Sequence, residues 1–302
     1  MFKGKGDIGQ SVTEFMNIRG TTRILGIFGD PVAHSLSPIM QNEALARAGI
    51  DAVYVPFHVR PEHLPAAVSA IRSLDLWGVN VTVPHKEQVG LFLDAIDPDA
   101  RLIGAVNTIV NRCGVLTGYN TDAPGLLRSL AGDLQFNPAG RHVLLLGAGG
   151  ACRAALTALS QAGAAWIGIA NRTRSRAEAL VREFGDVFRG TALASFALDP
   201  AQLSAVVPQI DLLVNTSAVG LKGEGFADFP WASVAPGVLV YDMVYAKGGT
   251  PFLQAARARG HRSADGLGML AAQGEEAFFL WTGQRPSGGV MMARLQAECA
   301  EN

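Results

Sequence analysis

The stretch HVLLLGAGGACR, residues 142–153, joins the clearest strand pattern of the chain to a glycine loop and an alanine-rich segment. A buried strand that runs directly into such a loop and a helix is typical of a nucleotide-binding βαβ unit. Backbone N–H groups and the helix N-terminus then face a pyrophosphate, which side chains would block. The match to G-x-G-x-x-G is incomplete because Cys152 occupies the third glycine position. An ordinary strand-to-helix turn is the alternative, but the flanking pattern favours a nucleotide site.

On both sides of this loop, strand-like apolar runs alternate with helical stretches. Strands are expected at 23–28, 52–59, 78–83, 105–110, 115–118, 142–146, 166–170, 210–215 and 238–243, and helices at 37–48, 61–74, from about 85, 123–130, after 150 and at 174–184. The alternation predicts an α/β protein. A length of 302 residues suggests two domains. We expect one α/β unit before about residue 122 and a second after it.

Composition narrows the class of protein. The balance of 25 basic and 26 acidic residues argues against a nucleic-acid partner. Cys113, Cys152 and Cys299 form no pair or cluster with metal-ligand spacing, so we expect no metal and a reducing compartment. The first 21 residues contain no apolar signal region, and no window approaches the ~18 apolar residues of a membrane helix. These features predict a cytoplasmic protein without a membrane partner.

The end of the second strand of the nucleotide unit indicates which nucleotide it binds. An acidic residue there would hold the ribose 2′-hydroxyl of NAD, but the chain reads NRTRSR at residues 171–176. Three arginines suit the 2′-phosphate of NADP through charge-assisted hydrogen bonds. The alternative is a basic first helical turn facing solvent. Cations at a helix N-terminus oppose the macrodipole, which disfavours that alternative.

Polar residues also occur where strands of the first unit are expected to end, the usual place of ligand sites in α/β sheets. They are Ser35, Ser37, Asn80, Thr82, Lys86, Asn107 and the run Asn120-Thr121-Asp122. Each has a simpler interpretation, with Ser37 or Asp122 as a helix cap and Lys86 as a solvated charge at the start of a helix. These residues alone do not decide between a ligand site and these structural roles.

Nine separated runs occur in one order between residues 23 and 300: GDPVAHSLSP, NVTVPHK, GAVNT, NTD, GAGGACR, NRTRSR, YDMVY, KGGTPFL and ADGLGMLAAQ. Together they resemble the shikimate dehydrogenase family. The resemblance implies NADP-dependent, reversible interconversion of 3-dehydroshikimate and shikimate, on the way to chorismate and the aromatic amino acids. It also implies an α/β substrate domain with a mainly parallel sheet at 1–122 and 268–302, where the C-terminal helices return, and a Rossmann-type NADP domain at 123–267. Oligomeric state stays open, with a homodimer as one option.

The resemblance assigns roles to individual residues. Lys86 and Asp122 would form the catalytic pair, since alcohol oxidation needs a base in hydrogen-bond reach and a cation beside the developing alkoxide. Ser35 and Ser37 would hold the substrate carboxylate, with Thr82, Asn107 and Gln273 on the carboxylate or ring hydroxyls and Tyr245 reaching across from the nucleotide side. Cofactor contacts would come from Gly147, Ala148, Gly149, Gly150 and Ala151 at the pyrophosphate, from Asn171, Arg172, Thr173, Arg174, Ser175 and Arg176 at the 2′-phosphate, and from Val244 and Gly266 near the nicotinamide.

Three positions depart from the family pattern: Ala123 after NTD, His85 before the lysine, and Cys152 in the glycine loop. None of the three removes a polar contact. The nearest rival is a quinate/shikimate dehydrogenase with relaxed substrate or cofactor choice, but Ser35 and Ser37 together with NRTRSR favour shikimate and NADP. A non-catalytic, metabolite-binding relative could lose the lysine or the aspartate at little structural cost, yet both are present.

Overall fold

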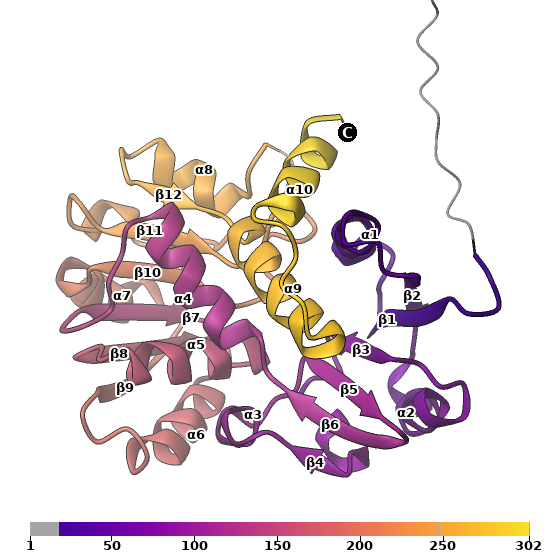
Figure 1. Ribbon diagram of the computed structural model, residues 1–302. Coiled ribbons are helices and arrows are strands. Elements are labelled where there is room, and N and C mark those ends of the chain that lie inside the picture. Colours follow the sequence, from indigo (N-terminus) through magenta and orange to yellow (C-terminus); the bar gives the residue numbers. More distant parts are fainter. Residues whose placement is uncertain (1–17, 247, 302) are drawn as a thin grey trace, which may run out of the picture.

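The computed structural model describes residues 18–246 and 248–301 and contains two six-stranded sheets with helices packed around them (Figure 1). The predicted α/β class is therefore confirmed. Most of the N-terminal segment, for which the sequence predicts no secretory signal, lies outside the described residues, as does Lys247 of the KGGTPFL run. No helix in the described part is long and apolar enough to cross a membrane.

The first sheet has the strand order β2-β1-β3-β5-β6-β4. Its strands are β1 (Arg23–Gly29), β2 (Ala52–His58), β3 (Gly78–Val81), β4 (Ala95–Ile96), β5 (Thr108–Arg112) and β6 (Val115–Tyr119). β1 pairs in parallel with β2 and β3, and β4 with β6, whereas β5 runs antiparallel to both of its neighbours. The parallel strands β1 and β3 end at one edge, so the segments that follow them, with Ser35, Ser37 and Lys86, begin close together.

Helices from both ends of the chain cover this sheet. They are α1 (Ser37–Arg47), α2 (Leu64–Ser73), α3 (Pro98–Ile103), α9 (Leu267–Thr282) and α10 (Val290–Glu301). Trp281 of α9 is 1% exposed, packs against Tyr54 and donates its indole N–H to Ile109 O at 3.0 Å. The C-terminal helices thus return to the first sheet, as expected, because their apolar faces complete its core.

The second sheet is parallel throughout, with the order β12-β11-β10-β7-β8-β9. Its strands are β7 (His142–Leu146), β8 (Trp166–Asn171), β9 (Ala192–Ala197), β10 (Leu212–Asn215), β11 (Leu239–Asp242) and β12 (Ser263–Ala264), and its helices are α4 (Asp122–Asp133), α5 (Gly150–Gln161), α6 (Arg174–Gly185), α7 (Pro200–Val206) and α8 (Pro251–Arg257). Central strands of a parallel sheet are buried on both faces, which explains the uninterrupted HVLLL run.

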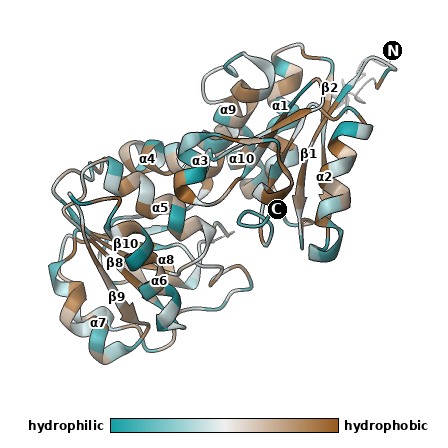
Figure 2. Ribbon diagram, turned by 90° about the horizontal axis from the view of Figure 1, so that it is seen from below, coloured by the Kyte–Doolittle hydropathy of each residue, from teal (hydrophilic) through white to brown (hydrophobic). Residues whose placement is uncertain are grey.

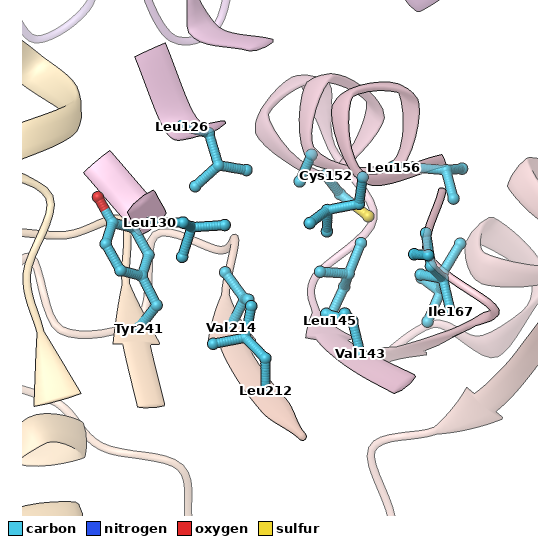
Figure 3. Close-up of a cluster of buried hydrophobic side chains, with 14 of the residues drawn as sticks. Leu126, Leu130, Val143, Leu145, Cys152, Leu156, Ile167, Leu212, Val214 and Tyr241 are labelled. Atoms are coloured by element: carbon cyan, nitrogen blue, oxygen red, sulfur yellow. The ribbon is translucent and has the colours of Figure 1, made fainter. Parts of the chain in front are cut away.

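One face of the second sheet packs against α4 and α5 (Figure 3). Leu126 and Leu130 of α4 lie on the side of β10 and β11, and Cys152 and Leu156 of α5 lie over β7. Cys152 is fully buried in this cluster, and burial raises the pKa of its thiol to about 12. The thiol therefore acts as a small apolar group that allows α5 to approach the sheet.

Helices α4 and α9 lie side by side between the two sheets (Figure 1). Viewed from below and coloured by hydropathy, β1 is largely hydrophobic and α6 carries hydrophilic segments (Figure 2). This is the expected pattern for strands inside and helices outside an α/β unit. The first helical residue of α4 is Asp122 and α9 contains Gln273, so this central pair brings predicted site residues to the junction of the two sheets.

Three expectations about local structure are wrong. Residues 82–88 form turns and only a short 3-10 helix follows at Val89–Phe92, so Lys86 does not begin an α-helix. Its carbonyl accepts a hydrogen bond from Val106 N–H at 2.8 Å and is unavailable to a helix. Ser37 is not the cap of α1, since Leu36 occupies that position. Asp122 is the first residue of α4 rather than its cap, which is Thr121.

Candidate active site

Lys86 and Asp122 form an ion pair at the junction of the two sheets. The distance from Lys86 Nζ to Asp122 Oδ2 is 2.7 Å, and the side chains are only 19% and 8% exposed. Lys86 comes from the turn after β3 and Asp122 from the start of α4. Two charges this poorly exposed are retained only when they neutralise each other. The interpretation of Lys86 as a solvated surface charge is therefore wrong.

Asn107 fixes the other oxygen of the Asp122 carboxylate. Its Nδ2 donates to Asp122 Oδ1 at 2.9 Å and to Thr121 Oγ1 at 3.0 Å. Its Oδ1 accepts from Thr121 N at 2.8 Å and from Thr108 Oγ1 at 3.0 Å. Both ends of the amide are thus engaged, and Asp122 is held from two sides.

The serine segment after β1 connects to the same network through buried side chains. The Ser37 hydroxyl lies near the Tyr54 phenol, whose pKa is raised by burial. Tyr54 Oη in turn donates to Asn80 Oδ1 at 2.8 Å. Asn80 Nδ2 donates to Thr108 Oγ1 at 3.0 Å, and Thr108 reaches Asn107. A continuous chain of hydrogen bonds therefore links Tyr54 to Asp122, and Ser37 lies beside its Tyr54 end. Ser35 Oγ accepts from Ser37 N–H at 3.3 Å, so the Ser35 side chain turns towards the start of α1.

The two remaining polar residues predicted on this side lie on different elements. Gln273 of α9 is 8% exposed, and Thr121 Oγ1 donates to its Oε1 at 3.4 Å. Gln273 is thus within the same network as Asn107. Thr82 follows β3, is half-buried, and its methyl group packs against Gly29 at the end of β1. The structure therefore brings Ser37, Lys86, Asn107, Asp122 and Gln273 together, with Ser35 and Thr82 at the edge of the group.

The glycine loop has the shape that a pyrophosphate requires. Gly147 has φ +127°, and a Cβ there would lie 2.9 Å from Thr216 Oγ1 and 3.0 Å from Ser217 N. A Cβ at Gly149 would meet no heavy atom within 4 Å, so the N-terminus of α5 is open. A Cβ at Gly150 would lie 3.7 Å from Lys86 Cβ. The loop at the start of α5 therefore lies beside Lys86.

The basic run at 171–176 follows β8 as predicted. Asn171 Nδ2 donates to Thr173 O at 2.9 Å and shapes the turn, and Arg174 pairs with Glu178 at 3.0 Å. The side chains of residues 172–176 are exposed. They lie at the end of the strand next to β7, where the adenosine ribose of a dinucleotide is bound in this fold. Exposed guanidinium groups at this place suit a phosphate.

On the other side of the loop, Val244 and Tyr245 follow β11. Val244 is 5% exposed and its N–H donates to Asp242 Oδ1 at 2.9 Å. Burial raises the pKa of the Tyr245 phenol, and the nearby Leu36 N–H opposes that rise. Tyr245 thus reaches the serine segment of the first sheet from the second. A Cβ at Gly266 would collide with Met243 O, so the chain passes this strand end only because residue 266 has no side chain.

Two residues of the network were not foreseen as site residues. Tyr54 and Thr108 lie in segments whose pattern is that of an ordinary strand or strand start. Nothing in one sequence distinguishes a buried tyrosine that orients a serine from one that fills the core. Asn80, in contrast, can be recognised in the sequence as a residue that needs a hydrogen-bond partner, because an amide in the apolar run GVNV is costly unless it is hydrogen-bonded. Among the described residues, no group of three His, Cys, Asp or Glu could hold a metal ion.

Comparisons with known proteins identify relatives over most of the chain. Residues 27–109 match the shikimate dehydrogenase substrate binding domain, 129–217 the shikimate / quinate 5-dehydrogenase domain, and 266–296 the shikimate 5′-dehydrogenase C-terminal domain. The chain is 52% identical over 282 residues to the shikimate dehydrogenase (NADP(+)) of Geobacter metallireducens, covering 93% of this chain and 99% of that protein.

Solved structures of shikimate dehydrogenases have a similar fold. Shikimate dehydrogenase from Aquifex aeolicus superposes with a TM-score of 0.84 at 36% identity, covering 92% of this chain and 99% of that one. The enzyme from Thermus thermophilus, solved in complex with NADP(H) and shikimate, superposes with a TM-score of 0.80 at 37% identity, covering 91% and 99%. On the matched domains, the identity and the shared fold, this chain belongs to the shikimate dehydrogenase family.

Proposed function

We propose that the protein is a shikimate dehydrogenase that reduces 3-dehydroshikimate to shikimate with NADPH and catalyses the reverse reaction, in the route to chorismate and the aromatic amino acids. The observation that carries this proposal is the buried Lys86–Asp122 pair, which lies between the serine segment of the first sheet and the open glycine loop of the second. Membership of the family and the relative's NADP(+) specificity support it.

Lys86 moves the proton in this mechanism. In the reduction the Lys86 ammonium gives a proton to the carbonyl oxygen, and in the oxidation the neutral Lys86 amine takes the proton of the reacting hydroxyl. Its positive charge stabilises the alkoxide that develops between these states. Asp122, held by Asn107, keeps the Lys86 Nζ in place through the 2.7 Å contact. The chemistry supplied by bound NADP is acceptance of the hydride from the hydroxyl-bearing carbon.

The substrate is oriented by groups from both sheets. Ser35 and Ser37 bind the carboxylate together with Tyr245, while Thr82, Asn107 and Gln273 bind the carboxylate or ring hydroxyls. Residues 147–151 receive the pyrophosphate, residues 171–176 the 2′-phosphate, and Val244 and Gly266 the nicotinamide region. These contacts fix the reacting carbon next to Lys86, which converts binding energy into orientation.

Steady-state kinetics with two acids and two cofactors tests the proposal. Purified protein is assayed for oxidation of shikimate and of quinate, each with NADP and with NAD. We expect the highest kcat/KM for shikimate with NADP. Comparable values for quinate or NAD would instead indicate a quinate/shikimate dehydrogenase with relaxed choice. Binding of shikimate without any reduction of either cofactor would indicate a non-catalytic relative and contradict the proposal.

The domain boundaries (1–122 with 268–302, and 123–267), the cytoplasmic location and the homodimer remain predictions. The absence of a metal requirement also remains a prediction, which full activity in the presence of a chelator would support. Size-exclusion chromatography with light scattering measures the oligomeric state directly.

A further inference from the structure

We propose that Asp242, a residue with no assigned role in the reaction, is a positioning residue. It fixes the backbone at Val244 and thereby holds Val244 and Tyr245, which we call the cofactor-side wall of the site. The proposal rests on the proposed function, because Val244 and the adjacent Tyr245 are expected to contact cofactor and substrate. Asp242 is the last residue of β11 and is completely buried.

Three donors converge on the Asp242 carboxylate. Oδ1 accepts from Val244 N at 2.9 Å and from Asn215 Nδ2 at 2.8 Å, while Oδ2 accepts from Thr250 Oγ1 at 2.5 Å. Asn215 and Thr250 are themselves fully buried. One carboxylate at the end of β11 thus connects three other places. They are the end of the neighbouring strand β10, the backbone of Val244 in the wall, and Thr250, the cap of α8.

Asn215 extends this connection towards the glycine loop. Its Oδ1 accepts from Ser217 N at 2.9 Å and from Ser217 Oγ at 2.7 Å. Ser217 N lies against Gly147, the first glycine of the loop, where a Cβ would be 3.0 Å away. The Asn215–Asp242 pair therefore connects the predicted pyrophosphate and nicotinamide ends of the cofactor site. On the opposite side, the Tyr245 phenol lies near Leu36 N–H, next to the serines that are expected to bind the carboxylate.

The charge of Asp242 has no cationic partner among its hydrogen-bond donors. Burial, reinforced by nearby Asp265, raises its pKa to about 6, so the carboxylate costs folding free energy when ionised. A structural role alone would be met as well by an apolar residue of similar size. The converging donors instead indicate that an acceptor is required at this point, because the Val244 N–H and the Thr250 hydroxyl would otherwise be buried without an acceptor, whereas Asn215 Nδ2 also donates to Val219 O.

Two substitutions at one position separate positioning from packing. Asp242→Ala removes the acceptor, whereas Asp242→Asn keeps an oxygen for Val244 N–H and presents an amide N–H to Thr250. We expect Asp242→Ala to raise both the Kd for NADPH, measured by fluorescence, and the KM for shikimate by ~10-fold or more, the effect of leaving a buried donor unpaired. The loss in kcat should be smaller, because Lys86 and Asp122 are untouched. Asp242→Asn should lie within about 3-fold of the unmodified protein for both constants.

Asp211→Ala is the matched control, because Asp211 precedes β10, at the opposite end of the strands of the same sheet, and also accepts two hydrogen bonds, from Arg141 and from His142 N. It should lower stability without changing either constant. Should Asp242→Ala fail to fold, Thr250→Val, which removes the donor to Oδ2, should still raise both constants. Unchanged constants in a folded Asp242→Ala or in Thr250→Val, or equal defects in the Ala and Asn variants, would overturn the proposal. NADPH binding requires no turnover, so this result stands apart from failure of shikimate oxidation.

Discussion

Lys86 is one of only five lysines in the chain, and its position explains why this residue type is needed. A lysine side chain that is 19% exposed loses most of its hydration, and Asp122 at 2.7 Å offsets the cost. A surface lysine would seldom be held in one place. Here the ion pair, the hydrogen bonds of Asn107 and the short turn after β3 leave Nζ little freedom, which is what proton transfer to a bound substrate requires.

Replacing Lys86 by alanine tests this role. Lys86→Ala should lower kcat for NADP-linked shikimate oxidation by at least ~100-fold, because the acid–base group is lost. Lys222→Ala is the matched control, since Lys222 is exposed in the segment after β10 and should leave kcat unchanged. Near-normal turnover of Lys86→Ala in a stopped or continuous NADPH assay would remove Lys86 from the mechanism.

Arg172 provides a test of cofactor choice. Arg172→Ala should weaken NADP binding by ~10-fold to ~100-fold, the usual range for one charge-assisted hydrogen bond, while NAD binding changes little. Arg182→Ala, in the last turn of α6, the helix that begins just after Arg172, should affect neither cofactor. Calorimetry measures the dissociation constants of NADP and NAD for each variant. An equal loss for NADP and NAD would show that Arg172 does not contact the 2′-phosphate.

Asp242 should make stability depend on pH in a definite direction. Its pKa is about 6 in the folded protein against 3.8 as the ordinary value, so protonation favours folding. The stabilisation by protonated Asp242 is complete below the pKa of this residue in the unfolded chain, and it is lost as pH rises through the folded pKa of about 6. Asp242→Asn should therefore be more stable than the unmodified protein near neutral pH, by up to about 3 kcal/mol, and the difference should shrink towards about pH 4. Urea unfolding of both proteins at several pH values measures it, and a difference independent of pH would contradict the expected titration.

At the scale of elements, prediction from the sequence succeeds where one segment determines its own structure. The strand at 142–146 matches β7 residue for residue, because a run of large apolar residues before glycines can be satisfied only inside a parallel sheet. The segment around Lys86, in contrast, does not determine its own structure. Its helical pattern is overruled by a tertiary contact, the hydrogen bond from Val106 N to Lys86 O, which no local pattern reveals. For the same reason the Tyr54–Asn80 link beneath Ser37 could not be foreseen.

The loop between β7 and α5 makes a prediction that separates binding from folding. Gly149 has an extended backbone, with φ −111°, and a Cβ there meets no heavy atom within 4 Å. Gly149→Ala should consequently keep the stability of the ligand-free protein, while the methyl group obstructs the pyrophosphate and raises the Kd for NADPH by ~10-fold or more. Gly185→Ala, at the end of α6 and also without neighbours, controls for the added methyl group. Unchanged NADPH affinity in Gly149→Ala would show that the loop does not hold the phosphates.

The whole molecule depends on contacts that join the two sheets, since neither sheet alone holds all the predicted site residues. Arg153, in the first turn of α5, makes such a contact. Its Nε donates to Ile103 O at 2.6 Å at the end of α3, and its guanidinium pairs with Glu183 of α6. The side chain is 14% exposed and lies over the Phe184 ring at 5.1 Å. Because α5 also begins at the glycine loop, Arg153 sets the position of that loop relative to Lys86.

Gly104, which follows Ile103, makes room for this arginine. Its φ is +71°, and a Cβ there would collide with Arg153 Nη2. Gly104→Ala and Arg153→Met should each destabilise the protein by about 1–3 kcal/mol, the first through backbone strain and displacement of the guanidinium, the second through a lost partner for Ile103 O. Both remove the same contact, so the double variant should be less destabilised than the sum by ~0.5 kcal/mol or more. Urea unfolding of the four proteins measures this coupling, and NADPH affinity should fall in all three variants. Strict additivity, with unaltered NADPH binding, would mean that Arg153 stabilises α5 without joining the two halves of the site.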